Sequence, residues 1–135
     1  MAARLLREQL GPGSDWSVVS AGLSAALGMP PSEGAVTVMD ESGMDLRDHR
    51  SRPVDGDLVD ASDVIVVMTA SHREQMLALY PGAAQKVFLL KSFDETGPGG
   101  DLEDPLGAPM DVYRHTRDEI EEALPGLISF LGELQ

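Results

Sequence analysis

Two short apolar runs restrict the possible folds of this chain more than any other feature of its sequence. Residues 64–68 read VIVVM and residues 87–90 read VFLL, with no polar residue in either run. Strands with continuous apolar sequence are typical of parallel sheets that helices cover on both faces. Because helical patterns alternate with these runs, the sequence predicts one α/β domain over residues 1–135, with a mostly parallel sheet.

The other predicted elements follow from apolar spacing and from capping residues. Trp16 to Ala21 is expected to be a further strand, and Ser71 with Glu74 forms a capping box that would open a helix ended by Pro81. Pro125 should kink or interrupt the last helix. The remaining predicted elements are helices at 2–10, at 33–42 with Ser32 as N-cap, at 58–61 and from 111 onward, and a long acidic loop at 92–109.

The charge balance excludes several classes of partner. The net charge is −13, and the ten Lys and Arg residues are scattered, which argues against binding to nucleic acid. No apolar run reaches the length of a membrane span. The first ten residues, MAARLLREQL, lack the apolar core and cleavage site of a secretory signal, so a cytoplasmic location is expected.

Cysteine is absent from the sequence. Within these residues, its absence excludes disulfides, thiolate metal sites and cysteine nucleophiles. The three histidines, His49, His72 and His115, do not have the spacing of a metal site. Neither a metal nor another cofactor is therefore expected.

Five segments carry a resemblance to a known family. They are SAGL at 20–23, GMDLRDHRSRPV at 43–54, ASDVIVVMT at 61–69, KVFLLKSF at 86–93 and EDPLGAPMDVYRHTRDEIEEAL at 103–124. Their sequence and order resemble the bacterial low-molecular-weight protein-tyrosine-phosphatases, whose superfamily includes protein-arginine phosphatases and some arsenate reductases. The resemblance implies a three-layer fold and hydrolysis of phosphotyrosine or phosphoarginine in phosphorylated proteins.

The same resemblance implies roles for four residues. In the family, a cysteine thiolate attacks phosphorus and a carboxylic acid on an opposite loop protonates the leaving group. Asp104, which Pro105 restricts to extended geometry, matches that acid. Leu106 and Tyr113 match positions at the substrate pocket, and Ser20 matches a serine beside the catalytic loop. The alternatives are structural roles: a solvated loop acid, an aliphatic wall, a packing tyrosine and a strand-end hydroxyl.

The resemblance also shows what these residues lack. Residues 1–6 match the segment that follows the family's catalytic loop, so the first strand, the nucleophilic cysteine and the phosphate-binding arginine have no counterpart. The domain is therefore expected to be incomplete at its N-terminus and inactive. Without a central strand, residues 16–21 and 64–68 would pair directly, or a homodimer would form through their exposed edges, or the fold would be marginal.

Two interpretations of the function follow. The chain is either a shortened phosphatase, as the retention of Asp104 favours, or a non-catalytic phosphatase-like interaction protein. An arsenate reductase needs cysteines and is set aside. Leu106 is not the aromatic residue that many relatives carry after the Asp-Pro pair, so the sequence does not distinguish phosphotyrosine from phosphoarginine.

Overall fold

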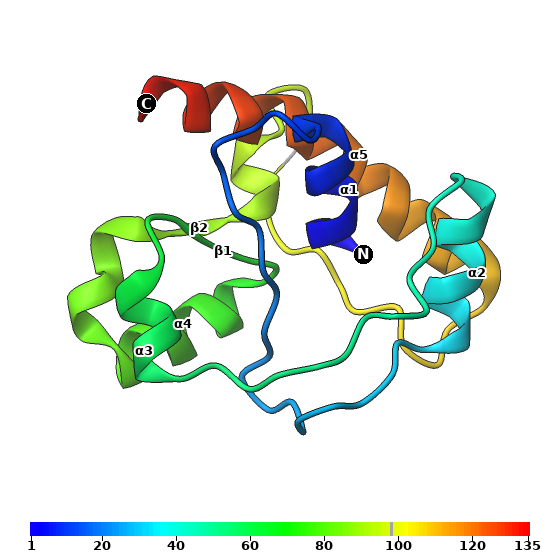
Figure 1. The fold of residues 1–135 in the computed structure, drawn as a ribbon, viewed down its shortest axis with the longest axis horizontal. Coiled ribbons are helices and arrows are strands. Elements are labelled where there is room, and N and C mark those ends of the chain that lie inside the picture. Colours follow the sequence, from blue (N-terminus) through cyan, green and yellow to red (C-terminus); the bar gives the residue numbers. More distant parts are fainter. Residues whose placement is uncertain (98) are drawn as a thin grey trace.

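A computed structural model describes residues 1–97 and 99–135 (Figure 1). Pro98, part of the long loop expected at 92–109, lies outside the described residues. Along the chain come α1 (Ala2–Leu10), α2 (Glu33–Glu41), α3 (Gly56–Ala61), β1 (Ile65–Val67), α4 (Ala70–Leu79), the 3₁₀ helix η1 (Pro81–Lys86), β2 (Val87–Leu89), the 3₁₀ helix η2 (Leu90–Phe93) and α5 (Met110–Glu133).

The strands β1 and β2 pair in parallel, with Val66 opposite Phe88. The connection between them runs through α4 and η1, as a parallel pair requires. In Figure 1, α3 and α4 lie on one side of the sheet and α1 and α5 on the other. The predicted α/β class and three-layer arrangement are confirmed.

The strand predicted at 64–68 is found as β1, but the prediction that it is fully buried is wrong. Only residues 65–67 form β1, and all five residues of the run are half-buried, whereas Val87 in β2 is 2 % exposed. Within the described ranges, β1 has a hydrogen-bonded neighbour on one side only. A strand without a second neighbour leaves one flank accessible, which accounts for the incomplete burial.

The strand predicted at Trp16 to Ala21 is also absent from the described structure. The nearest ladder contact is an isolated parallel bridge between Gly22 and Pro53. The carbonyl of Val18 instead accepts hydrogen bonds from Nε and Nη2 of Arg7, at 2.9 and 2.7 Å. A segment becomes a strand only where a neighbour supplies the ladder, and direct pairing with β1 is not what this structure shows.

The capping residue predicted from the sequence is confirmed at α2 and wrong at α4. Ser32 Oγ accepts from the Ala35 N–H at 3.3 Å, as predicted. At α4 the capping residue is Thr69, whose Oγ1 accepts from the His72 N–H at 3.1 Å. The predicted box of Ser71 and Glu74 is wrong, because Thr69, two residues after the end of β1, supplies an equivalent hydroxyl two residues before Ser71.

The last helix, α5, continues through Pro125, so the predicted interruption is wrong. Its apolar face is buried, at Ile120, Leu124, Leu127 and Leu131 among others, and this packing outweighs the intrinsic cost of an internal proline. Next to Pro125, Gly126 has no side chain, which lets the backbone carbonyl of Phe93 in η2 approach the helix closely.

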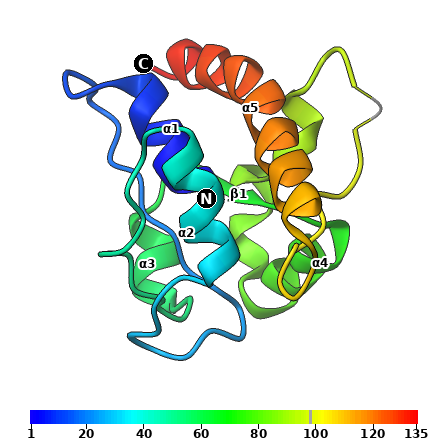
Figure 2. The same cartoon turned by 90° about the vertical axis from the view of Figure 1, so that its right-hand side faces the viewer.

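Two apolar clusters form the core. The larger joins α1, α2, η2 and α5. Both α1 and α2 pack on α5, which runs along the top and the right of Figure 2. The smaller holds α3, α4, η1 and β2 together. In the part of the chain that the structure describes, no helix is both long and apolar enough to cross a membrane.

Candidate functional site

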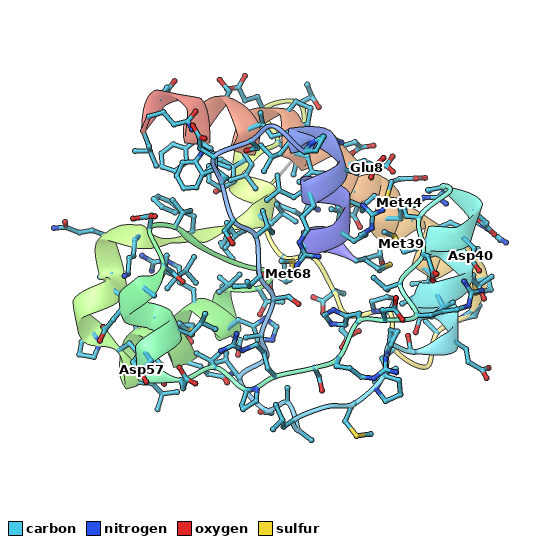
Figure 3. All side chains as sticks on the ribbon, viewed as in Figure 1. Glu8, Met39, Asp40, Met44, Asp57 and Met68 are labelled. Carbon is cyan, nitrogen blue, oxygen red and sulfur yellow. The ribbon has the colours of Figure 1, made fainter. Side chains whose placement is uncertain are left out.

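The loop that carries Asp104 is attached to the carboxyl end of β1. The N–H of Leu102 donates to the carbonyl of Met68 at 2.8 Å, and the Leu102 side chain, 3 % exposed, belongs to the larger core cluster. Figure 3 places Met68 centrally, between the α1 side and the α3–α4 side. Asp104 therefore lies two residues after Leu102, whose buried side chain and backbone bond hold this part of the loop.

The carboxyl group of Asp104 is exposed and held in a local turn. Its Oδ1 accepts a hydrogen bond from the N–H of Leu106 at 3.0 Å. Pro105 is buried, and its carbonyl accepts from the Ala108 N–H at 2.8 Å, which closes the turn. The carboxylate is thus oriented by its own loop and accessible from solvent.

Leu106 and Tyr113, the predicted pocket residues, lie in very different environments. Leu106 is 70 % exposed, next to Asp104 in sequence, whereas Tyr113 is 5 % exposed in the core. The Tyr113 hydroxyl lies 3.1 Å from Ser32 Oγ. Its ring packs on the start of α2, where a Cβ on Gly34 would lie 2.5 Å from the ring. Tyr113 belongs to α5, and its side chain packs against α2.

Ser20 lies apart from the other three predicted site residues. It is half-buried and lines a hollow of about 250 Å³ together with Arg4 and Arg7 of α1 and with His49. Burial, and then nearby positive charges that include Arg7 and Arg50, hold the pKa of His49 below its ordinary value. The structure does not place Asp104, Leu106 or Tyr113 in the lining of this hollow.

One residue of the acid loop was missed by sequence reasoning. In the sequence, Asp101 is one of several acidic residues in the loop at 92–109, but its Oδ1 accepts from the N–H of Ala70, the first residue of α4, at 2.8 Å. The one sequence signal is its position directly before Leu102, an apolar residue in an otherwise polar stretch. Over residues 1–97 and 99–135, no cluster of three acidic or histidine side chains is arranged for a metal ion.

Comparison with known proteins identifies the family. The model of the low molecular weight phosphotyrosine protein phosphatase family matches residues 1–135. A protein-arginine-phosphatase of Geobacillus stearothermophilus is 38 % identical over 127 residues, which are 94 % of this chain and 83 % of the relative. A probable low molecular weight protein-tyrosine-phosphatase, EpsP of Ralstonia solanacearum, is 36 % identical over 113 residues, 84 % of this chain and 73 % of that protein.

Solved structures agree with these sequence matches. The YwlE arginine phosphatase of Geobacillus stearothermophilus superposes with a TM-score of 0.87 at 36 % identity, over 99 % of this chain and 84 % of that one. A YwlE arginine phosphatase whose active-site cysteine is replaced by a phosphorylated serine gives a TM-score of 0.89 at 32 % identity, over 97 % and 86 % of the two chains. The resemblance seen in the sequence is confirmed: the chain belongs to the low molecular weight protein phosphatase family, in which its relatives include protein-arginine and protein-tyrosine phosphatases.

Proposed function

We propose that this chain provides the scaffold and the general acid of a phosphoprotein phosphatase, with Asp104 as the acid, and that these 135 residues do not catalyse turnover by themselves. The observation that supports the site most directly is the bond between the Leu102 N–H and the Met68 carbonyl. It attaches the Asp104 loop to the carboxyl end of a parallel strand, which is the edge where such sheets bind ligands.

The environment of Asp104 suits proton transfer. In its protonated form the carboxyl would donate to the leaving atom, oxygen for phosphotyrosine or nitrogen for phosphoarginine, as the bond to phosphorus breaks. As a carboxylate it would then accept a proton from the water that hydrolyses the phosphoenzyme. Exposure gives the substrate access, and the bond from Leu106 N–H fixes one oxygen, so that the other is free to face the substrate.

The proposed lack of turnover rests on the cysteine content. In the YwlE relative with a substituted active-site cysteine, the serine at that position is phosphorylated, so the position receives the phosphoryl group. No residue of the 135 is a cysteine. Because nucleophile, phosphate cradle and acid act as a unit, loss of the nucleophile costs several powers of ten in rate.

The test measures hydrolysis of p-nitrophenyl phosphate and of phosphotyrosine and phosphoarginine peptides by the purified chain. We expect no turnover above that of an Asp104→Asn variant. Hydrolysis that vanadate abolishes would refute the proposed inactivity.

A second arm uses a chain lengthened by the in-frame codons that precede the Met1 codon. If it gains vanadate-sensitive activity, Asp104→Asn should lower kcat by about 10²- to 10⁴-fold, and the control Glu103→Gln should leave it within a few-fold. An Asp104→Asn variant with unchanged kcat would remove Asp104 from the mechanism. The two peptides identify the substrate class.

The second candidate function is a non-catalytic interaction protein. It is favoured by β1, one flank of which has no strand partner among the described residues. Such an edge accepts another strand, which fits a homodimer formed through strand edges. Light scattering after size exclusion would count against the dimer if the chain is a compact monomer. A lengthened chain that still lacks activity would favour this candidate.

A cytoplasmic location is also a proposal, and it rests on the sequence alone.

A further inference from the structure

The first turn of α4 is capped by two residues that lie far apart in the chain. Thr69 Oγ1 accepts from the His72 N–H at 3.1 Å, and Asp101 Oδ1 accepts from the Ala70 N–H at 2.8 Å. The first N–H groups of a helix have no partner within the helix, and the helix end carries a partial positive charge. The carboxylate of Asp101 meets both needs from outside the helix.

The neighbouring residue, Leu102, makes a second attachment at the same place. Its N–H donates to the carbonyl of Met68, and its side chain is 3 % exposed in the core. Asp101 and Leu102 therefore hold the loop by one side-chain bond and one backbone bond, to the residues on either side of Thr69. The acid loop is clamped to the junction of β1 and α4.

The two residues directly before this clamp are glycines, which constrain the conformation of the loop little. Gly99 and Gly100 both have positive φ, 71° and 91°, and glycine has the largest conformational freedom of any residue. After the clamp, two residues of extended chain reach at most about 7 Å from Leu102 to Asp104. The position of Asp104 is therefore set by the clamp at 101 and 102.

We propose that Asp101 is a positioning residue for Asp104: its carboxylate, bound to the start of α4, holds the acid loop at the carboxyl end of the sheet. The inference rests on the proposed role of Asp104 as general acid. The competing role for Asp101 is purely structural, a cap that stabilises α4 with no effect on the acid loop. The two roles differ in what happens at Leu102, Asp104 and Leu106 when the carboxylate is removed.

The experiment uses NMR of the purified chain and of the variants Asp101→Ala and Asp101→Asn. In Asp101→Ala the amide of Leu102 should exchange about tenfold faster, the scale of one lost charged hydrogen bond. The Leu106 amide and the Asp104 carboxyl carbon should shift toward unstructured values, because the turn they form is no longer held. Asn keeps an acceptor oxygen, so Asp101→Asn should stay within about threefold of the wild type.

Glu103→Ala is the matched control, since Glu103 lies in the same loop and is exposed. It should leave the Leu102 exchange rate unchanged. Altered signals confined to α4 in Asp101→Ala, with Leu106 and Asp104 as in the wild type, would overturn the proposal. So would a wild-type Leu102 amide that exchanges as fast as that of Glu103, a result independent of whether any variant folds.

None of these readouts requires turnover. An Asp104→Asn substitution that does not slow a lengthened, active chain would refute the proposed function while leaving the clamp intact. Leu106 and Asp104 signals that stay unchanged in Asp101→Ala would refute the positioning role while leaving the Asp104 result unaffected. The two failures are therefore distinguishable.

Discussion

The hydroxyl of Tyr113 lies 3.1 Å from Oγ of Ser32, 81 residues away in the chain. Ser32 also caps α2 by accepting from the Ala35 N–H. One serine thus joins the first turn of α2 to the first turn of α5. Since the acid loop ends where α5 begins, this contact fixes the far end of the loop that Asp101 and Leu102 fix at its near end.

Replacing Tyr113 with Phe should separate the hydrogen bond from the packing. Tyr113→Phe keeps the buried ring and should lower the free energy of unfolding by about 1 kcal/mol, the usual net value of such a bond. Tyr113→Ala should cost about 3–5 kcal/mol, because it also leaves a cavity in the core. Urea denaturation followed by circular dichroism measures both. Equal losses of stability in the two variants would contradict separate contributions from the hydrogen bond and from the packing of the ring.

Two glycines of the same helix should respond in opposite directions to substitution by alanine. Alanine at an exposed helical position gains up to about 1 kcal/mol over glycine. Gly132→Ala should show some of this gain, since a Cβ there meets nothing within 4 Å. Gly126→Ala should instead destabilise by about 1–3 kcal/mol, because its Cβ would overlap the carbonyl of Phe93. Thermal unfolding of the two variants makes the comparison, and an equal response would contradict the close approach.

The sequence predicts those parts of this fold that depend on local chemistry. Ser32 as a cap and the helices predicted at 2–10 and 58–61 need only neighbouring residues. Ser32 caps α2, and the two helices are found at Ala2–Leu10 and Gly56–Ala61. The strand expected at 16–21 depends on a partner that no local pattern encodes. The continuity of α5 through Pro125 likewise depends on η2, a segment far upstream in the chain that packs against α5.

In the candidate site, too, local features could be predicted from the sequence, and contacts with distant residues could not. Asp104-Pro105 is visible as a motif because the family resemblance points to it, and the structure adds that its carboxyl accepts from Leu106 N–H. Asp101 could not be distinguished from the other loop acids, since its partner, the start of α4, precedes it by 31 residues. Tyr113 matches a pocket position by resemblance, but only the packing on Gly34 reveals its burial.

The ion pair of Lys91 and Glu119 should contribute to stability as a pair. Lys91 Nζ lies 2.6 Å from Glu119 Oε2, and the side chains are only 12 % and 21 % exposed. Lys91→Met leaves a poorly hydrated carboxylate and should cost about 1–3 kcal/mol, whereas Lys91→Met combined with Glu119→Gln should cost less than the sum of the single changes. A double-mutant cycle in urea measures the coupling. Additive costs would show that η2 and α5 do not depend on this pair.

Acid stability should depend on Asp94, at the start of the acid loop. Its Oδ1 accepts from the Thr96 hydroxyl at 2.8 Å and from the N–H groups of Thr96 and Gly97, at 3.0 and 3.1 Å. The Thr96 hydroxyl is the main cause that holds the pKa of Asp94 below its ordinary value. Because the folded-state pKa is the lower one, this carboxylate stabilises the fold fully above the unfolded-state pKa, about 3.9.

That stabilisation should disappear as the pH falls from about 4 through the folded-state pKa, as protonation removes the acceptor. In Thr96→Val the pKa of Asp94, followed by carboxyl NMR, should rise, and the loss of stability in acid should become shallower. Thr96→Ser keeps the hydroxyl and should behave as the wild type. If Thr96→Val left the Asp94 pKa unchanged, the Thr96 hydroxyl would not be the cause of the lowered pKa. The turn would then be held by the backbone N–H groups alone, and the acid dependence of the loop would have to arise from another carboxylate.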